Sequence, residues 1–94
     1  MKLLNWTLTE KGRETIPERV KAELKAFYER YKDRLESGIL DYELVYFLTI
    51  GDETVRKVIV EGWKGTDLSY SQFVALCMLY LKEVGKGVKI YLSS

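Results

Sequence analysis

Carboxylates are the side chains of this chain whose spacing could support chemistry. Asp41 and Glu43 lie two residues apart, and Asp52 is followed directly by Glu53. Such pairs offer the oxygen ligands that hard cations prefer, although acidic residues at strand ends and turns are usually solvated. The sequence has no histidine and a single cysteine, which leaves no ligand set for a soft metal and no imidazole for acid–base catalysis. We therefore predict no catalytic residue, no metal site, no cofactor and no enzymatic activity.

Glycine spacing and the cysteine give no stronger signal of a reactive site. Gly62-x-x-Gly65 and Gly85-x-Gly87 have neither the spacing of a Walker loop nor that of a dinucleotide fingerprint. Cys77 lies among apolar neighbours, which is typical of a packed thiol. We therefore predict a protein that works by binding.

The composition is that of a folded domain. The chain has 94 residues, of which 47% are hydrophobic and 31% are charged, and these values predict one domain over residues 1–94. Its longest apolar run is about half of the roughly 20 residues that a membrane helix needs, and the N-terminus has no signal-peptide pattern. We therefore predict a cytoplasmic protein without a membrane partner. The scarcity of Asn and Gln beside many Glu, Lys and Arg residues indicates a thermophilic source.

Two helices have marked ends. Thr15 and Glu18 have the spacing of a capping box, and Gly38 lies where a helix would stop, so we predict a helix over residues 15–37. A second helix, residues 70–84, is predicted to begin after the N-cap Ser69 and to end at Gly85.

The segments outside these helices favour strands. Residues 41–50 and 54–61 are rich in β-branched and aromatic residues and are separated by a glycine turn, which predicts a β-hairpin. Residues 2–9 and 88–92 alternate between apolar and polar side chains. The resulting order, β-α-β-β-α-β, predicts an α+β fold, the ferredoxin-like two-layer sandwich.

A winged helix-turn-helix domain is the alternative fold. Val55, Val58 and Ile59 also have helical spacing in a helix that would begin at Asp52, and residues 44–48 could form a further short helix. In addition, the stretch from Leu8 to Glu14, Leu-Thr-Glu-Lys-Gly-Arg-Glu, is similar to one that often follows the wing of winged-helix regulators. Here it opens the chain instead, so we assign no family.

The second predicted helix carries more apolar surface than expected for a small domain. Its residues 73–81 carry no charge, and a domain of this size has little protein with which to bury a helix on all sides. We therefore predict self-association as a homo-oligomer. The predicted interface comprises three residues of the helix, two of the outer sheet face and one in the loop of residues 62–67, which we expect to be mobile: Leu76, Met78, Leu79, Val45, Ile59 and Trp63.

Nucleic-acid binding is the alternative function. The outer face of the predicted sheet carries two aromatic rings and two lysines, Phe47, Tyr91, Lys57 and Lys89, which could stack on unpaired bases and contact phosphates. A winged-helix DNA-binding regulator would be a second form of this alternative. The net charge of +1 does not by itself favour a nucleic-acid partner.

Overall fold

Helices form most of the part of the chain that the structure describes. The computed structural model describes residues 2–3, 8–35, 39–41, 49, 51–85 and 89–92. Its helices and short strands, in chain order, are β1 (Lys2–Leu3), α1 (Glu10–Thr15), α2 (Glu18–Leu35), β2 (Ile39–Asp41), α4 (Glu53–Lys64), α5 (Tyr70–Val84) and β3 (Lys89–Leu92).

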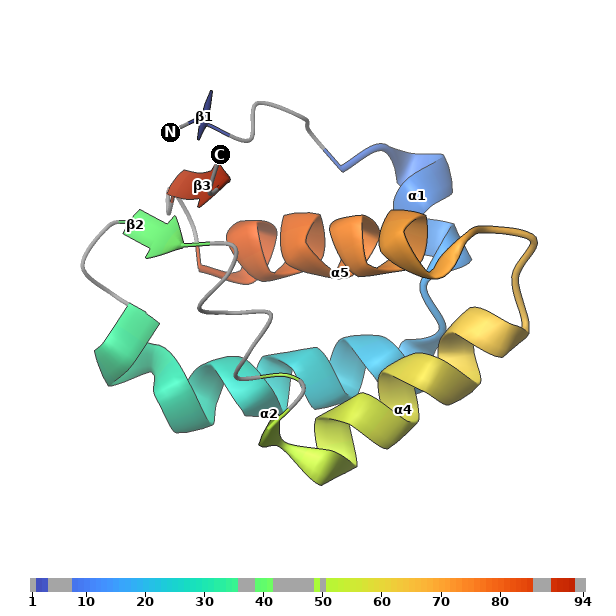
Figure 1. The fold of residues 1–94 in the computed structure, drawn as a ribbon, viewed down its shortest axis with the longest axis horizontal. Helices are drawn as coiled ribbons and strands as arrows, with labels where there is room; N and C mark the ends of the chain where they lie inside the picture. The colour runs from blue at the N-terminus through green and yellow to red at the C-terminus, as the bar shows by residue number, and fades with distance from the viewer. Residues whose placement is uncertain are drawn as a thin grey trace.

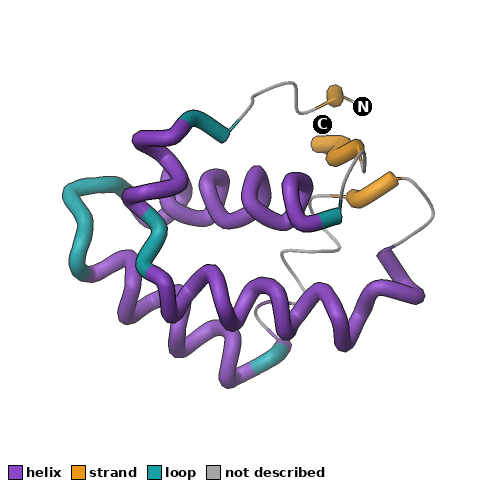
Figure 2. Tube along the Cα trace, turned by 180° about the vertical axis from the view of Figure 1, so that it is seen from behind, coloured by secondary structure: helices purple, strands orange, loops and turns teal. Residues whose placement is uncertain are grey.

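Helix α5 lies at the centre of the molecule. Helices α2 and α4 pack against one side of it, and α1 packs against another (Figure 1). The view from behind shows the same arrangement, with the short strands gathered near one end of α5 (Figure 2). The order of the strands is β1-β3-β2, with β1 antiparallel and β2 parallel to β3. The described body is thus a helical assembly, and its strands are two to four residues long.

The prediction of an α+β, ferredoxin-like sandwich is wrong. The second strand of the predicted hairpin, residues 54–61, lies within helix α4, so the four-stranded antiparallel sheet cannot form. The first strand of that hairpin, residues 41–50, lies largely outside the described residues. The helix predicted over residues 70–84 is confirmed as α5 with the same ends, and the helix predicted over residues 15–37 is confirmed as α2 with a later start, at Glu18. The C-terminal strand is confirmed as β3.

The winged helix-turn-helix alternative is also wrong as a fold. Its wing requires antiparallel strands that follow one another after the third helix. Instead, β3 pairs with β1 from the start of the chain and runs parallel to β2. Only one local part of that interpretation is confirmed, namely the helix that begins after Asp52.

Helix α4 forms from a segment rich in β-branched residues because its ends and its packing favour a helix. The Asp52 side chain accepts a hydrogen bond from the backbone N–H of Val55, and Gly65 forms the C-cap. The apolar side chains Val55, Val58 and Ile59 recur at steps of three and one and are all buried. Burial of this face outweighs the weak preference of Val and Ile for strands.

The N-terminal region differs from the prediction because the capping box at Thr15 does not form. Thr9 is the N-cap of the unpredicted helix α1, and its side chain accepts a hydrogen bond from the backbone N–H of Gly12. Thr15 is the last residue of α1, and its hydroxyl donates to the carbonyl of Lys11 at 2.8 Å. The chain therefore breaks at Ile16 and Pro17 before α2 begins. The capping box of α5, with Ser69 and Gln72, is confirmed.

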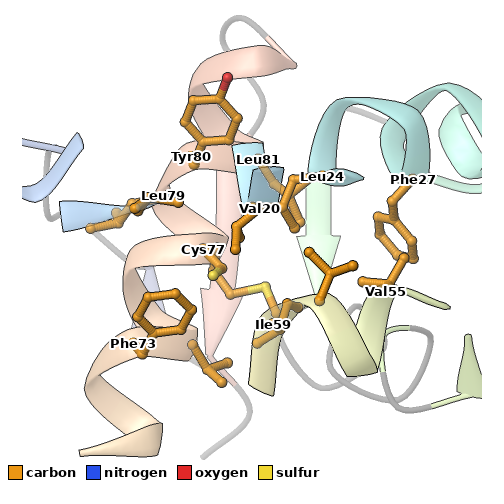
Figure 3. Packing of buried hydrophobic residues seen from close by; sticks show 14 of the residues in the cluster. Val20, Leu24, Phe27, Val55, Ile59, Phe73, Cys77, Leu79, Tyr80 and Leu81 are labelled. Carbon is orange, nitrogen blue, oxygen red and sulfur yellow. The ribbon is translucent and has the colours of Figure 1, made fainter. Parts of the chain in front are cut away.

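The core surrounds α5 on all sides. Five consecutive residues of this helix are buried, Cys77, Met78, Leu79, Tyr80 and Leu81, and at about 100° per residue they span a full turn. Figure 3 shows Leu79 pointing away from the side that faces Leu24 and Val20 of α2, toward the N-terminal part of the chain. The expectation that a chain of this length could not enclose the helix is therefore wrong.

Helices α2 and α4 approach each other closely at a glycine, Gly62. A Cβ atom at Gly62 would lie 2.6 Å from Cγ2 of Val20 and 3.3 Å from Cζ of Phe73. Both neighbours are buried, and the β-branched Val20 has little rotameric freedom in a helix. Glycine at this position therefore sets the distance between the two helices.

We expect Gly62→Ala to lower the free energy of unfolding by about 1–2 kcal/mol, because overpacking of the contact with Val20 outweighs the higher helix propensity of alanine. Urea denaturation followed by circular dichroism measures this change. Gly65→Ala is the matched control, since a Cβ there would meet only the carbonyl oxygen of Gly62 at 3.6 Å. Equal stability of the two variants would contradict the close approach.

Candidate functional site

The structure does not bring the predicted interface residues together on one surface. Met78 and Leu79 are 1% and 5% exposed and belong to the core, as does Ile59. Leu76 and Trp63 are partly buried and pack against the edge of this core. Val45 lies outside the described residues. Within the described structure, Trp63 and Leu76 are therefore the members of the predicted set that retain accessible apolar surface.

The predicted nucleic-acid surface does not form as a sheet face. Lys57 lies on α4, where its ammonium group is 3.1 Å from the carboxylate of Glu53. Lys89 and Tyr91 belong to β3, but only their backbone is described, and Phe47 lies outside the described residues. The change of residues 54–61 from strand to helix removes the surface on which these four side chains were expected to meet.

Asp52 has a structural role in place of a cation site. Its Oδ1 accepts a hydrogen bond from the N–H of Val55 at 3.2 Å, and its Oδ2 lies 2.8 Å from Nη2 of Arg30 and 3.5 Å from the hydroxyl of Tyr31. Desolvation by burial would raise the pKa of Asp52, but the hydrogen bonds from Val55 and Arg30 and the charge of Arg30 hold it below its ordinary value. Among the described residues, no group of three or more acidic or cysteine side chains is placed to hold a metal ion.

Cys77 is packed, as predicted. The thiol is buried in the core, and this burial raises its pKa to about 12 because the thiolate cannot be solvated there. A cavity of ≈ 10 Å³ lies beside it, and its lining combines apolar residues with polar ones: Leu24, Ile59, Val74, Met78, Thr49, Arg56 and Tyr70. This volume is at the lower limit for one water molecule, so the thiol has neither the ionisation nor the space to act on a substrate.

The junction between α4 and α5 holds the aromatic side chains Trp63 and Tyr70. The indole Nε1 of Trp63 donates to the carbonyl of Leu68 at 2.8 Å, and its ring meets that of Tyr70 edge to face with centroids 5.2 Å apart. Trp63, Leu68 and Tyr70 are all partly buried and pack against the core. Because the indole N–H is already bonded, the accessible part of the Trp63 ring is apolar.

Hydrogen bonds fix the turn that carries these side chains. The hydroxyl of Thr66 donates to the carbonyl of Trp63 at 2.7 Å and accepts from the N–H of Leu68 at 3.3 Å. The prediction of a mobile loop over residues 62–67 is not supported, because Gly62, Trp63 and Lys64 form the last turn of α4. Trp63 was a predicted interface candidate, whereas Leu68 and Tyr70, which flank the Ser69 N-cap, were not.

The outer face of α4 forms a shallow, open groove. It is lined by three cations, one valine and one carboxylate: Arg56, Lys57, Lys64, Val60 and Glu61. Glu61 pairs with Arg19 of α2 at 3.0 Å. Arg56 and Lys64, by contrast, have no carboxylate within ion-pair distance in the described part of the chain. These two residues were not predicted, because they share this face only when the segment is helical.

Comparison with known protein families, with curated proteins and with solved structures finds no match to this chain. Over the described residues, no helix has the length and apolar character needed to span a membrane. Two surfaces of the described structure are candidates for binding, the α4–α5 junction and the α4 groove.

We expect Asp52→Ala to lower the free energy of unfolding at neutral pH by about 1–2 kcal/mol, because α4 loses its N-cap. Asp52→Asn retains a cap acceptor and should cost less. Since the folded-state pKa of Asp52 is depressed, its carboxylate stabilises the fold fully above the unfolded pKa of about 4, and this contribution is lost as the pH falls through the folded pKa.

Urea denaturation at pH 7 and at about pH 3 tests this assignment. Wild type should lose more stability between the two pH values than Asp52→Asn, which has no carboxylate to protonate at this position. Equal losses in the two proteins would show that Asp52 does not contribute through its charge.

Proposed function

We propose that this chain is a small non-catalytic binding domain that associates with a second copy of itself through the α4–α5 junction. The observation that carries the proposal is the cluster of partly exposed apolar side chains at this junction, Trp63, Leu68 and Tyr70. Tryptophan and tyrosine are enriched among the residues that dominate binding energy at protein interfaces.

The junction is suited to contact because it is already ordered. Its turn is closed by the hydrogen bonds of Thr66, and the Trp63 ring is held between the Leu68 carbonyl and the Tyr70 ring. A surface that is fixed before binding loses little side-chain entropy when a partner docks. A symmetric dimer would place the same cluster of each copy against that of the other, as two-fold interfaces do.

The centre of α5 is not part of this interface. Met78 and Leu79 are enclosed by the chain's own helices, so the surplus of apolar surface is smaller than the sequence indicates. What remains accessible is a patch of a few side chains, which favours a weak dimer rather than an obligate one.

We expect sedimentation equilibrium to show a dimer whose population rises with protein concentration. Trp63→Ala should weaken it by about thirtyfold, which corresponds to the roughly 2 kcal/mol of a central interface residue. Tyr31→Ala is the matched control, because Tyr31 is also a partly buried aromatic residue at the edge of the core but lies on α2 against Phe27.

Circular dichroism establishes that both variants are folded under the conditions used. A wild-type chain that is monomeric at high micromolar concentration would refute self-association. Equal weakening by Trp63→Ala and Tyr31→Ala would show that the junction is not the interface.

Binding to single-stranded nucleic acid is the second candidate function, and the α4 groove is the observation that favours it. Arg56, Lys57 and Lys64 line the groove with Val60 between them. Two of these cations have no acidic partner among the described residues, so they are available to phosphates. The overall charge of the chain is near neutral, and any binding would therefore depend on this local cluster.

If the groove binds a single-stranded oligonucleotide, two phosphate contacts, by Arg56 and Lys64, predict that log K falls with log salt concentration with a slope of about −1.4. Fluorescence anisotropy of a labelled oligonucleotide at several salt concentrations measures this slope. The double variant Arg56→Glu, Lys64→Glu should abolish binding, whereas Lys25→Glu on the exposed face of α2 should not. Equal binding by both variants would exclude the groove.

A further inference from the structure

The N-terminal arm, residues 8–16, reaches the core with its two ends and contacts α5 with its middle. Leu8 and Ile16 are 7% and 1% exposed, whereas α1 between them has no buried residue. In the middle of the arm, a Cβ atom at Gly12 would lie 3.2 Å from Cδ2 of Leu76. The arm therefore lies close against α5 and covers Leu76, but it contributes few buried side chains of its own.

An exposed ion pair holds the middle of the arm in place. The guanidinium of Arg13 contacts the carboxylate of Glu83 through both Nε, at 3.2 Å, and Nη2. The two side chains are 35% and 43% exposed. Their hydrogen bond holds the pKa of Glu83 below its ordinary value, but ion pairs this accessible to water contribute little to stability.

The arm joins the body at a built-in break. Ile16 has extended backbone angles and precedes Pro17, and a residue before proline is disfavoured in a helix. A Cβ atom at Gly62 would be 3.5 Å from Pro17, so the break lies beside the last turn of α4, the turn that carries Trp63. Figure 1 shows this connection at the same end of the molecule as the α4–α5 turn.

We propose that two copies of this chain associate by exchanging their N-terminal arms about the break at Ile16 and Pro17, each arm taking the same position on α5 of the other copy. This inference rests on the proposed self-association and names its geometry.

A second copy is the partner that fits the α5 surface beneath the arm. An arm from another copy makes the same contacts with Leu76 and Glu83 that the chain's own arm makes, so exchange creates no unsatisfied apolar surface. Because the break lies beside Trp63, opening there brings the two α4–α5 junctions near each other. The exchanged dimer thus gains contact between the junctions that the closed monomer lacks. β1 precedes the arm, and its pairing with β3 would be remade between copies in the same way.

A charge exchange across the Arg13–Glu83 pair tests the proposal. Arg13→Glu places two carboxylates together in a closed monomer, and Glu83→Arg places two guanidinium groups together. When the two variants are mixed, an arm-exchanged heterodimer pairs opposite charges at both positions. We expect native mass spectrometry to show roughly tenfold more heterodimer than either homodimer, since two exposed pairs are restored.

The double variant Arg13→Glu, Glu83→Arg is the control, because it restores an inverted pair within one chain and should behave as wild type. No enrichment of the heterodimer, with this control folded, would overturn arm exchange. If wild type nevertheless dimerises, the proposed function stands and only the exchange is refuted. If wild type is also monomeric, both are refuted.

A second variant changes the connection rather than the charges. Inserting a flexible Gly-Ser segment between Ile16 and Pro17 lets each arm fold back on its own body without strain, which favours closed monomers over exchanged dimers. We expect the dimer population to fall several-fold while the circular dichroism spectrum is unchanged. An unchanged dimer population would argue against exchange at this position.

Discussion

The all-round burial of α5 is the constraint on which the rest of this structure depends. Its apolar residues occupy every side of the helix over the turn from Cys77 to Leu81, so each side must be covered. Helices α2 and α4 cover one side, and the N-terminal arm lies over another. A chain of 94 residues can do this because its helices pack around one central helix instead of covering one face of a sheet.

The packing against α5 is tighter on one side of the helix than on the other. On the side of α2 and α4, buried apolar side chains interdigitate and the helices approach closely at Gly62. On the side of α1, the contacts are a few apolar side chains and one exposed ion pair, Arg13–Glu83. Local opening costs the least free energy where few apolar contacts are lost. This difference in packing is the physical basis for treating the arm as the exchangeable element.

The surface of the protein follows from the same arrangement. Once α4 is helical, Val55, Val58 and Ile59 turn inward, and the cations Arg56 and Lys64 share the outer face. The end of α4 then meets the start of α5 in a closed turn that leaves part of Trp63 accessible. Both candidate binding surfaces therefore depend on α4 being a helix. Neither surface would form if these residues were a strand.

Features that depend on local chemistry could be predicted from the amino-acid sequence. The helices α2 and α5, the Ser69–Gln72 capping box, the packed thiol of Cys77 and the C-terminal strand could all be predicted, because each depends on neighbouring residues or on a strong period. The sequence also indicated Asp52 as the possible start of a helix, and it is the N-cap of α4. The β-branched residues that follow it, however, favoured a strand.

Only the tertiary structure decided between strand and helix for residues 54–61. That choice depends on burial against α2 and α5, which lie far away in the sequence, and such burial outweighs local propensity. Tertiary packing likewise decided that Leu79 lies in the core, because the local sequence does not show which side of α5 other segments will cover. Sequence shows how much apolar surface a helix carries, whereas the fold determines which segments are close enough to cover it.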